Sequence, residues 1–165
     1  INHEASTANF GFTPSLRFPT GSTSDSYPVG DGSLDVGASL SFSHETTFFY
    51  QYYDLFYWHN SRGKRGINRG DEFGVDVNLG IHPYHNNRYN LGCFLMLDLS
   101  ARYEGHGQDT AGATGGKRVS LGPILMAYWN NLMLRVDVKF PVYQHVWGSQ
   151  VARGTEINAG LGVVF

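Results

Sequence analysis

The chain has 165 residues, a length typical of one domain, and its formal net charge of −2 excludes the basic surface expected of a nucleic-acid partner. Charged residues make up 16% of it, against about 25% in an average soluble domain, yet its mean hydropathy is −0.27 and no run approaches the roughly 20 apolar residues of a membrane helix. A helical membrane protein is therefore excluded, whereas a transmembrane β-barrel fits, because only alternate residues of its strands meet lipid.

Eight segments alternate apolar and polar residues with a period of two, as β-strands do. In chain order they are 7–18, 33–43, 47–58, 71–82, 89–103, 118–129, 132–144 and 154–165. Eight strands are enough to close a small barrel. We therefore predict an all-β fold, an antiparallel up-and-down transmembrane β-barrel of about eight strands in a single domain over residues 1–165. More strands are expected if the protein continues upstream of Ile1, and the absence of an initial Met and of a signal peptide suggests a processed or partial chain.

The segment 132–144 is the most informative of the eight. Its apolar residues share one parity, while Arg135, Asp137 and Lys139 share the other. Three charges on one strand cannot face lipid, so this parity must point to the interior.

The segments at 47–58 and 154–165 supply two further signals. The first is aromatic on both faces, and Asp54 alone decides which face points inward. The second alternates up to Phe165, and a strand that ends in an aromatic residue resembles the C-terminal signature by which outer-membrane proteins are recognised for barrel assembly.

The connections between these segments alternate in length. Residues 19–32, 59–70, 104–117 and 145–153 form long connections, and residues 44–46, 83–88 and 130–131 form short ones. Bacterial barrels have long extracellular loops and short periplasmic turns. The pattern predicts the outer membrane of a Gram-negative bacterium, with both termini in the periplasm. A soluble sandwich or lipocalin-like barrel is the weaker alternative, because it gives no reason to segregate loop length.

Two stretches resemble a known family. Residues 18–35 read FPTGSTSDSYPVGDGSLD, and residues 141–150 read PVYQHVWGSQ. Both are similar to the outer-membrane transporters grouped around the meta-pathway of phenol degradation. The resemblance covers the two ends of the chain, and it reaches the middle only through the rhythm of the strands. It implies a porin-like barrel that moves small, hydrophobic or aromatic compounds across the outer membrane, and barrels of that family tend to be longer than this chain.

The inward parity collects a cluster of charged residues. They are Arg17, Asp35, Asp54, Glu72, Asp76, Asp98, Arg102, Arg135, Asp137, Lys139 and Glu156. In an eight-stranded barrel, whose interior is just wide enough for side chains, such charges would pair and plug the lumen. In a wider barrel the same residues would line a channel. We therefore carry two functions, a porin-like transporter and a non-transporting barrel that anchors or partners another envelope component.

No catalytic or metal site is predicted, and no cofactor. His145, Ser149 and Glu156 suggest a hydrolase, but they lack the His-x-Ser spacing of lipid A deacylase barrels. His82 and His85 have no third ligand nearby in the sequence, so a polar rim is the better interpretation. Cys93 is the only cysteine, which rules out an internal disulfide.

Two sets of residues are expected to contact the membrane. The basic residues of one long connection should meet lipopolysaccharide phosphates; they are Arg62, Lys64, Arg65 and Arg69. Aromatic residues near the strand ends should form the interfacial girdles of a barrel; they are Tyr57, Trp58, Tyr103, Trp129, Trp147 and Phe165.

Overall fold

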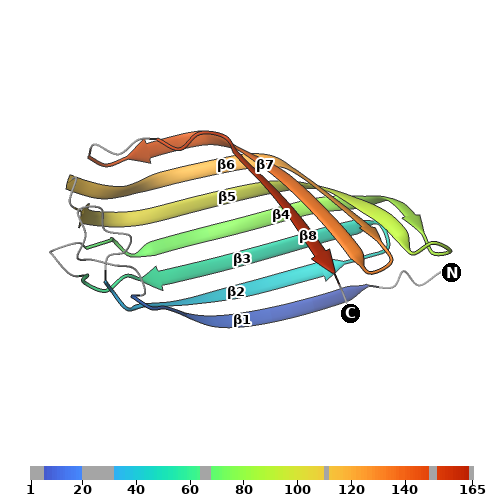
Figure 1. The fold of residues 1–165 in the computed structure, drawn as a ribbon, viewed down its shortest axis with the longest axis horizontal. Helices are drawn as coiled ribbons and strands as arrows, with labels where there is room; N and C mark the ends of the chain where they lie inside the picture. Colours follow the sequence, from blue (N-terminus) through green and yellow to red (C-terminus); the bar gives the residue numbers. More distant parts are fainter. Residues whose placement is uncertain (1–5, 20–31, 64–67, 110–111, 149–151, 164–165) are drawn as a thin grey trace.

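A computed structural model describes residues 6–19, 32–63, 68–109, 112–148 and 152–163. Within those ranges the protein is all-β and contains no helix (Figure 1). Eight strands form one antiparallel sheet in which every strand pairs with its neighbours in sequence. They are β1 (Thr7–Arg17), β2 (Asp35–Glu45), β3 (Phe49–His59), β4 (Glu72–Asn86), β5 (Leu91–Asp109), β6 (Gly112–Trp129), β7 (Leu132–Val146) and β8 (Glu156–Val163). None of the described residues belongs to a helix that is long and apolar enough to cross a membrane.

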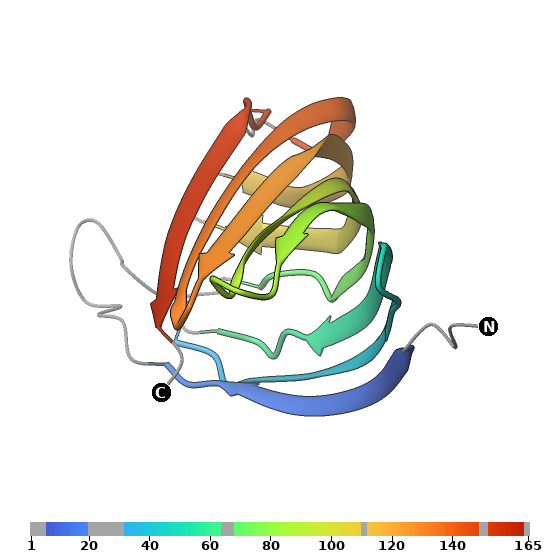
Figure 2. The same cartoon turned by 90° about the vertical axis from the view of Figure 1, so that its right-hand side faces the viewer.

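The sheet is curled but not closed. Figure 2 shows the strands following an arc that leaves β1 and β8 apart, and no pairing among the described residues joins these two edge strands. The predicted up-and-down order is confirmed, and the curvature is consistent with a β-barrel.

The two faces of the sheet differ in chemistry. The concave face carries the most buried polar residues, among them Asp35, Asp98 and Asp137, whose whole-residue exposed fractions are 0%, 2% and 6%. The convex face carries exposed apolar side chains such as Phe10 (84%) and Ile157 (72%). This arrangement inverts that of a soluble protein, in which apolar residues occupy the interior.

The ladders of the described sheet shift register at three places, between β4 and β5, between β5 and β6, and between β6 and β7. In β4 the pairing with β5 shifts by one residue between Ile81 and Tyr84, and as a result His82 and His85 both point to the concave face. In β7 the pairing with β6 shifts at Pro141, whose ring nitrogen has no hydrogen to donate to the ladder. The alternation in the sequence predicts Tyr143 on the inner face, but the extra residue turns it to the convex face.

The hairpin of β5 and β6 is longer than predicted. Residues 104–117 were expected to form a long loop, yet most of them extend these strands and leave only residues 110–111 between them. This stretch contains many glycines, which hide the alternation of apolar and polar residues without preventing backbone pairing. The prediction of strictly alternating loop lengths is therefore wrong at this connection, although the hairpin still extends from the end at which the other long connections lie.

Candidate functional site on the concave face

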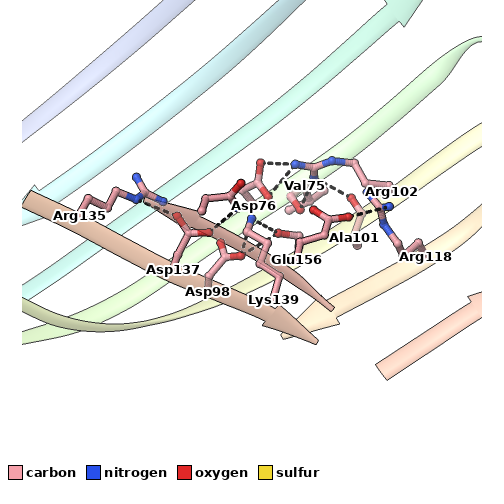
Figure 3. Close-up of polar contacts among 12 residues, drawn as sticks. Val75, Asp76, Asp98, Ala101, Arg102, Arg118, Arg135, Asp137, Lys139 and Glu156 are labelled. Atoms are coloured by element: carbon pink, nitrogen blue, oxygen red, sulfur yellow. Dashed lines mark hydrogen bonds and ion pairs between the residues drawn. The ribbon is translucent and has the colours of Figure 1, made fainter. Parts of the chain in front are cut away.

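The charged residues predicted for the interior all occupy the concave face, where ion pairs follow one another along the sheet (Figure 3). They come from every strand except β6. The register of the sheet sets their spacing, because the polar parity of each strand faces the polar parity of its neighbours.

Lys139 of β7 reaches over β6 to Asp98 of β5. Its Nζ lies 2.7 Å from the Asp98 carboxylate and donates to the Ser100 Oγ at 3.0 Å, while that hydroxyl donates to Asp98 at 2.9 Å. Gly122 of β6 is the register partner of Asp98, and a Cβ at Gly122 would collide with the backbone of Val138. Because glycine has no Cβ, the backbone of β7 approaches β6 closely at this position, and the Lys139 side chain crosses β6 to reach Asp98. The pair therefore joins two strands that are not neighbours, and it does so without spanning the lumen.

Arg102 of β5 holds the second ion pair, with Asp76 of β4. One guanidinium nitrogen lies 2.7 and 2.9 Å from the two carboxylate oxygens, and the other donates to the Val75 carbonyl at 3.2 Å. The guanidinium also stacks over the ring of Phe56, 4.6 Å from its centroid. Asp54 is the register partner of Asp76, so Arg102 offsets the repulsion between two facing carboxylates.

Arg17 organises the end of the concave face that lies near the long connections. Its Nη1 is 3.5 Å from Asp35, 3.5 Å from the Asn60 amide oxygen and 3.6 Å from Glu72. The guanidinium lies 4.5 Å from the ring centroid of Trp58. These contacts link β1 to β2, β3, β4 and the connection after β3, and Asp35 is fully buried.

Asp137 of β7 is buried between two partners. Arg135 donates to its carboxylate at 3.3 Å, and Asn158 of β8 donates to it at 2.8 Å. The Arg135 side chain is 50% exposed, so this ion pair joins a buried carboxylate to a guanidinium group that solvent reaches on the concave face.

Glu156, at the start of β8, forms ion pairs with two arginines. Arg118 lies 3.4 Å away and Arg153 lies 3.8 Å away. The side chains of Glu156 and Arg153 are 40% and 69% exposed. This cluster is therefore much more exposed to solvent than the ion pair of Lys139 and Asp98.

Two cavities open onto the concave face. The first, of about 260 Å³, lies toward the long connections; its lining includes the charged residues Glu72, Arg102, Glu104, Arg118 and Arg153. The second, of about 320 Å³, lies at mid-sheet, where aromatic, aliphatic and thioether groups meet charged ones. Its lining comprises Tyr50, Tyr52, Asp54, Asp76, Asn78, Met96, Asp98, Ile124, Met126, Arg135 and Lys139. Both cavities can hold a small molecule with polar and apolar parts.

A histidine cluster lies near the short turns. Tyr128 contacts the rings of His82 and His85, with its hydroxyl 3.3 Å from the first and 2.5 Å from the second. His82 also stacks on Phe94 at 4.1 Å. No group of three or more His, Cys, Asp or Glu that could hold a metal is found in the described part of the chain.

The residues predicted to contact lipopolysaccharide are only partly described. Arg62 and Arg69 are exposed in the connection before β4, where Arg62 forms an isolated bridge with Asn68. Lys64 and Arg65 lie outside the described residues. The structure therefore does not show these four residues as one cluster.

The predicted aromatic girdle is divided between the two faces. Tyr57 and Tyr103 are exposed on the convex face near the long connections, and Trp129 is 59% exposed on that face at the opposite end. Trp147 follows β7 and stacks on His106. Phe165 lies outside the described residues.

Trp58 corrects the prediction, because it lies on the concave face. Its ring covers the space above Gly37, its register partner on β2, and the Arg17 guanidinium lies over it. The parity of Asp54 in the same strand already indicated this position. Trp58 therefore packs inside the curve of the sheet and cannot belong to an outward belt.

Two charged concave residues were missed in the sequence. Arg118 and Glu104 share the parity of the interior residues in their strands. They lay at or beyond the predicted ends of these strands. Of the residues considered for a hydrolase, Ser149 lies outside the described residues, and His145 and Glu156 are on opposite faces.

Compared with models of protein families, with curated proteins and with solved structures, the chain gives no match.

Proposed function

We propose that the protein is a porin-like barrel of the outer membrane of a Gram-negative bacterium, and that small compounds cross the membrane along its concave face. One observation carries the proposal. Among the strand residues whose side chains are described, Lys117 is the only Asp, Glu, Lys or Arg on the convex face, whereas the concave face carries the ion pairs. A sheet with an apolar convex face and a charged concave face suits a barrel whose outer surface contacts lipid and whose interior contains water.

The two cavities support a path for a solute. The mid-sheet cavity places Tyr50, Tyr52 and Met96 beside Asp98 and Lys139, so an aromatic ring with a polar substituent would find both kinds of partner there. This chemistry agrees with the resemblance of two sequence stretches to transporters of phenol degradation. We accordingly propose small aromatic compounds as the transported class.

A second candidate is a barrel that carries no solute and holds another envelope component. The ion pair of Lys139 and Asp98 favours it, because buried charges that pair across a strand fill space and stiffen a core. In a closed barrel of eight strands, side chains of this size would occupy the interior.

Recordings in planar bilayers separate the two functions. The full protein is reconstituted, and single-channel currents are measured with and without a small phenol. Stable currents that the phenol reduces support the transporter, because a ligand in the mid-sheet cavity would obstruct ions. Protein that inserts into the bilayer but gives no current supports the structural barrel.

A soluble location would contradict both candidates. Cell fractionation followed by heat-dependent migration on gels is the direct test, since folded outer-membrane barrels migrate differently before and after boiling. Recovery in the soluble fraction would refute the membrane proposal.

A further inference from the structure

Lys117 occupies a distinctive place on the convex face. It is exposed, it is the single permanently charged strand side chain described on that face, and its Nζ lies 5.8 Å from the ring centroid of Tyr103. A solitary ammonium group on an apolar surface is costly in contact with hydrocarbon, and it is favourable where a long side chain reaches the polar headgroups.

The register places Lys117 in a row of suitable neighbours. Tyr57 pairs with Phe73, Phe73 with Tyr103, Tyr103 with Lys117, and Lys117 with His145. Three aromatic rings therefore lead across the convex face to two side chains that can donate hydrogen bonds. Rows of aromatic residues mark the level of the headgroups in membrane barrels.

A second aromatic pair adjoins this row. The ring of Trp147 meets that of Tyr103 edge to face, with 5.8 Å between the centroids, and it stacks on the ring of His106 at 3.8 Å. These rings hold the surface beside Lys117 rigid, and they present flat apolar surfaces on which a sugar can pack.

The depth of Lys117 fits the same interpretation. Trp129 lies twelve positions after it in β6 and is exposed on the convex face at the other end of the strand. At about 3.3 Å per residue and a tilt of about 40°, this corresponds to roughly 30 Å across the membrane. The hydrocarbon core of a bilayer is about that thick, so both residues would lie at its boundaries.

We propose that Lys117 and His145 bind the phosphate of a lipid headgroup, which in the outer leaflet is that of lipopolysaccharide. The inference rests on the proposed location in the outer membrane. Lys117 supplies the charge and His145 a hydrogen bond, while the described strand residues of the convex face supply no carboxylate to compete for the ammonium group. The sugar that carries the phosphate packs against Tyr103 and Trp147. This site differs from the basic connection that contains Arg62 and Arg69.

The test uses the full protein folded into phosphatidylcholine nanodiscs. Purified lipopolysaccharide is titrated in, and native mass spectrometry counts the molecules retained per folded chain. The variants are Lys117→Gln, His145→Gln and, as a matched control that removes an exposed positive charge in the short turn after β4, Arg88→Gln. Dephosphorylated lipopolysaccharide is the control ligand.

We expect Lys117→Gln to weaken retention at least tenfold and His145→Gln to weaken it less, with Arg88→Gln close to the original protein. Dephosphorylated lipopolysaccharide should bind the original protein as weakly as the phosphorylated form binds Lys117→Gln. Equal retention by Lys117→Gln and the original protein in folded nanodiscs would overturn the site while leaving the membrane proposal standing. Failure of the original protein to insert would overturn the membrane proposal, and this inference with it.

Discussion

The pair of Lys139 and Asp98 and the cluster around Glu156 use the same chemistry in different surroundings. The first lies in the middle of the concave face, where the side chain of Asp98 is 3% exposed and that of Lys139 is 22% exposed. The second lies at the rim near the long connections, where the carboxylate is 40% exposed and Arg153 is 69% exposed. A buried charge that loses its partner remains desolvated, whereas an exposed one recovers water. We therefore expect the loss of the central ion pair to lower the free energy of unfolding much more than the loss of an ion pair in the rim cluster.

Lys139→Met should have the largest effect. The substitution keeps the length of the side chain but leaves the Asp98 carboxylate without a cation in a nearly closed environment. Breaking a buried pair in this way costs about 3 to 5 kcal/mol, and the partial exposure of the lysine places the expected loss near the lower value. Urea unfolding of the protein in detergent micelles measures the change.

The double variant Lys139→Met, Asp98→Asn is the control for that loss. An asparagine at position 98 carries no charge and can still accept the hydrogen bond from Ser100. Most of the stability should return. If Lys139→Met alone lowers the free energy of unfolding by less than about 1 kcal/mol, the central pair is as accessible to solvent as the rim cluster, and the contrast between the two regions is wrong.

The convex side of β7 offers the next test at mid-sheet. Val136 lies on the opposite face from Asp137, so Val136→Arg would place a cation where the proposal puts lipid. We expect a loss of about 2 to 4 kcal/mol in folded vesicles if this site is near the bilayer midplane. Ser39→Arg on the concave face is the comparison, because there only crowding opposes the arginine. Equal losses for both variants would contradict the assignment of the two faces.

The sequence predicted the faces better than it predicted their partners. A period of two needs only residue types, and it assigned Lys139 and Asp98 to one face without structural information. The pairing of these residues depends on register and on the close approach of β6 and β7 that glycine permits at position 122, and neither follows from alternation. The sequence therefore predicted that the interior charges pair, without naming the partners, and the structure joins Asp98 to Lys139 over a single strand.

Bulges explain most of the remaining differences. One extra residue in β7 moves Tyr143 to the convex face, and one in β4 brings His82 and His85 together on the concave face. Pro141 and Pro83 mark these places in the sequence, but a proline is equally compatible with the end of a strand. The prediction took Pro83 as the end of a strand and assigned residues 83–88 to a connection, whereas β4 continues to Asn86.

Arg153→Gln should have a small effect. Glu156 keeps Arg118 at 3.4 Å after the substitution, and the lost partner was mostly in water. A change within about 0.5 kcal/mol is expected from urea unfolding. Arg118→Gln is the matched contrast, because that side chain is only 24% exposed and its removal should cost more. The reverse order of the two variants would show that burial does not decide the strength of the rim contacts.

The smallest expected effect concerns Asp71, which lies just before β4 near the same rim. The hydrogen bond from the Tyr57 hydroxyl, at 2.6 Å, lowers the pKa of Asp71 against a smaller opposing effect of burial, and His59 and the backbone N–H of Asn60 lower it further. A carboxyl group whose pKa is depressed on folding stabilises the protein fully above its unfolded pKa of about 3.9, and this contribution disappears as the pH falls through the folded pKa. Asp71→Asn should therefore reduce stability at neutral pH and match the original protein in strong acid.

Urea unfolding at pH 7, and again at the lowest pH at which the protein still folds, measures the difference in unfolding free energy between Asp71→Asn and the original protein. Asp71 is 42% exposed, so the gap at neutral pH should be small and should shrink in high salt. Tyr57→Phe is the control, because it removes the hydrogen bond while leaving the carboxylate, and it should reproduce the largest part of the gap. A gap that persists unchanged into acid would mean that Asp71 acts through packing, and the rim would then be tighter than the exposure of its charged groups indicates.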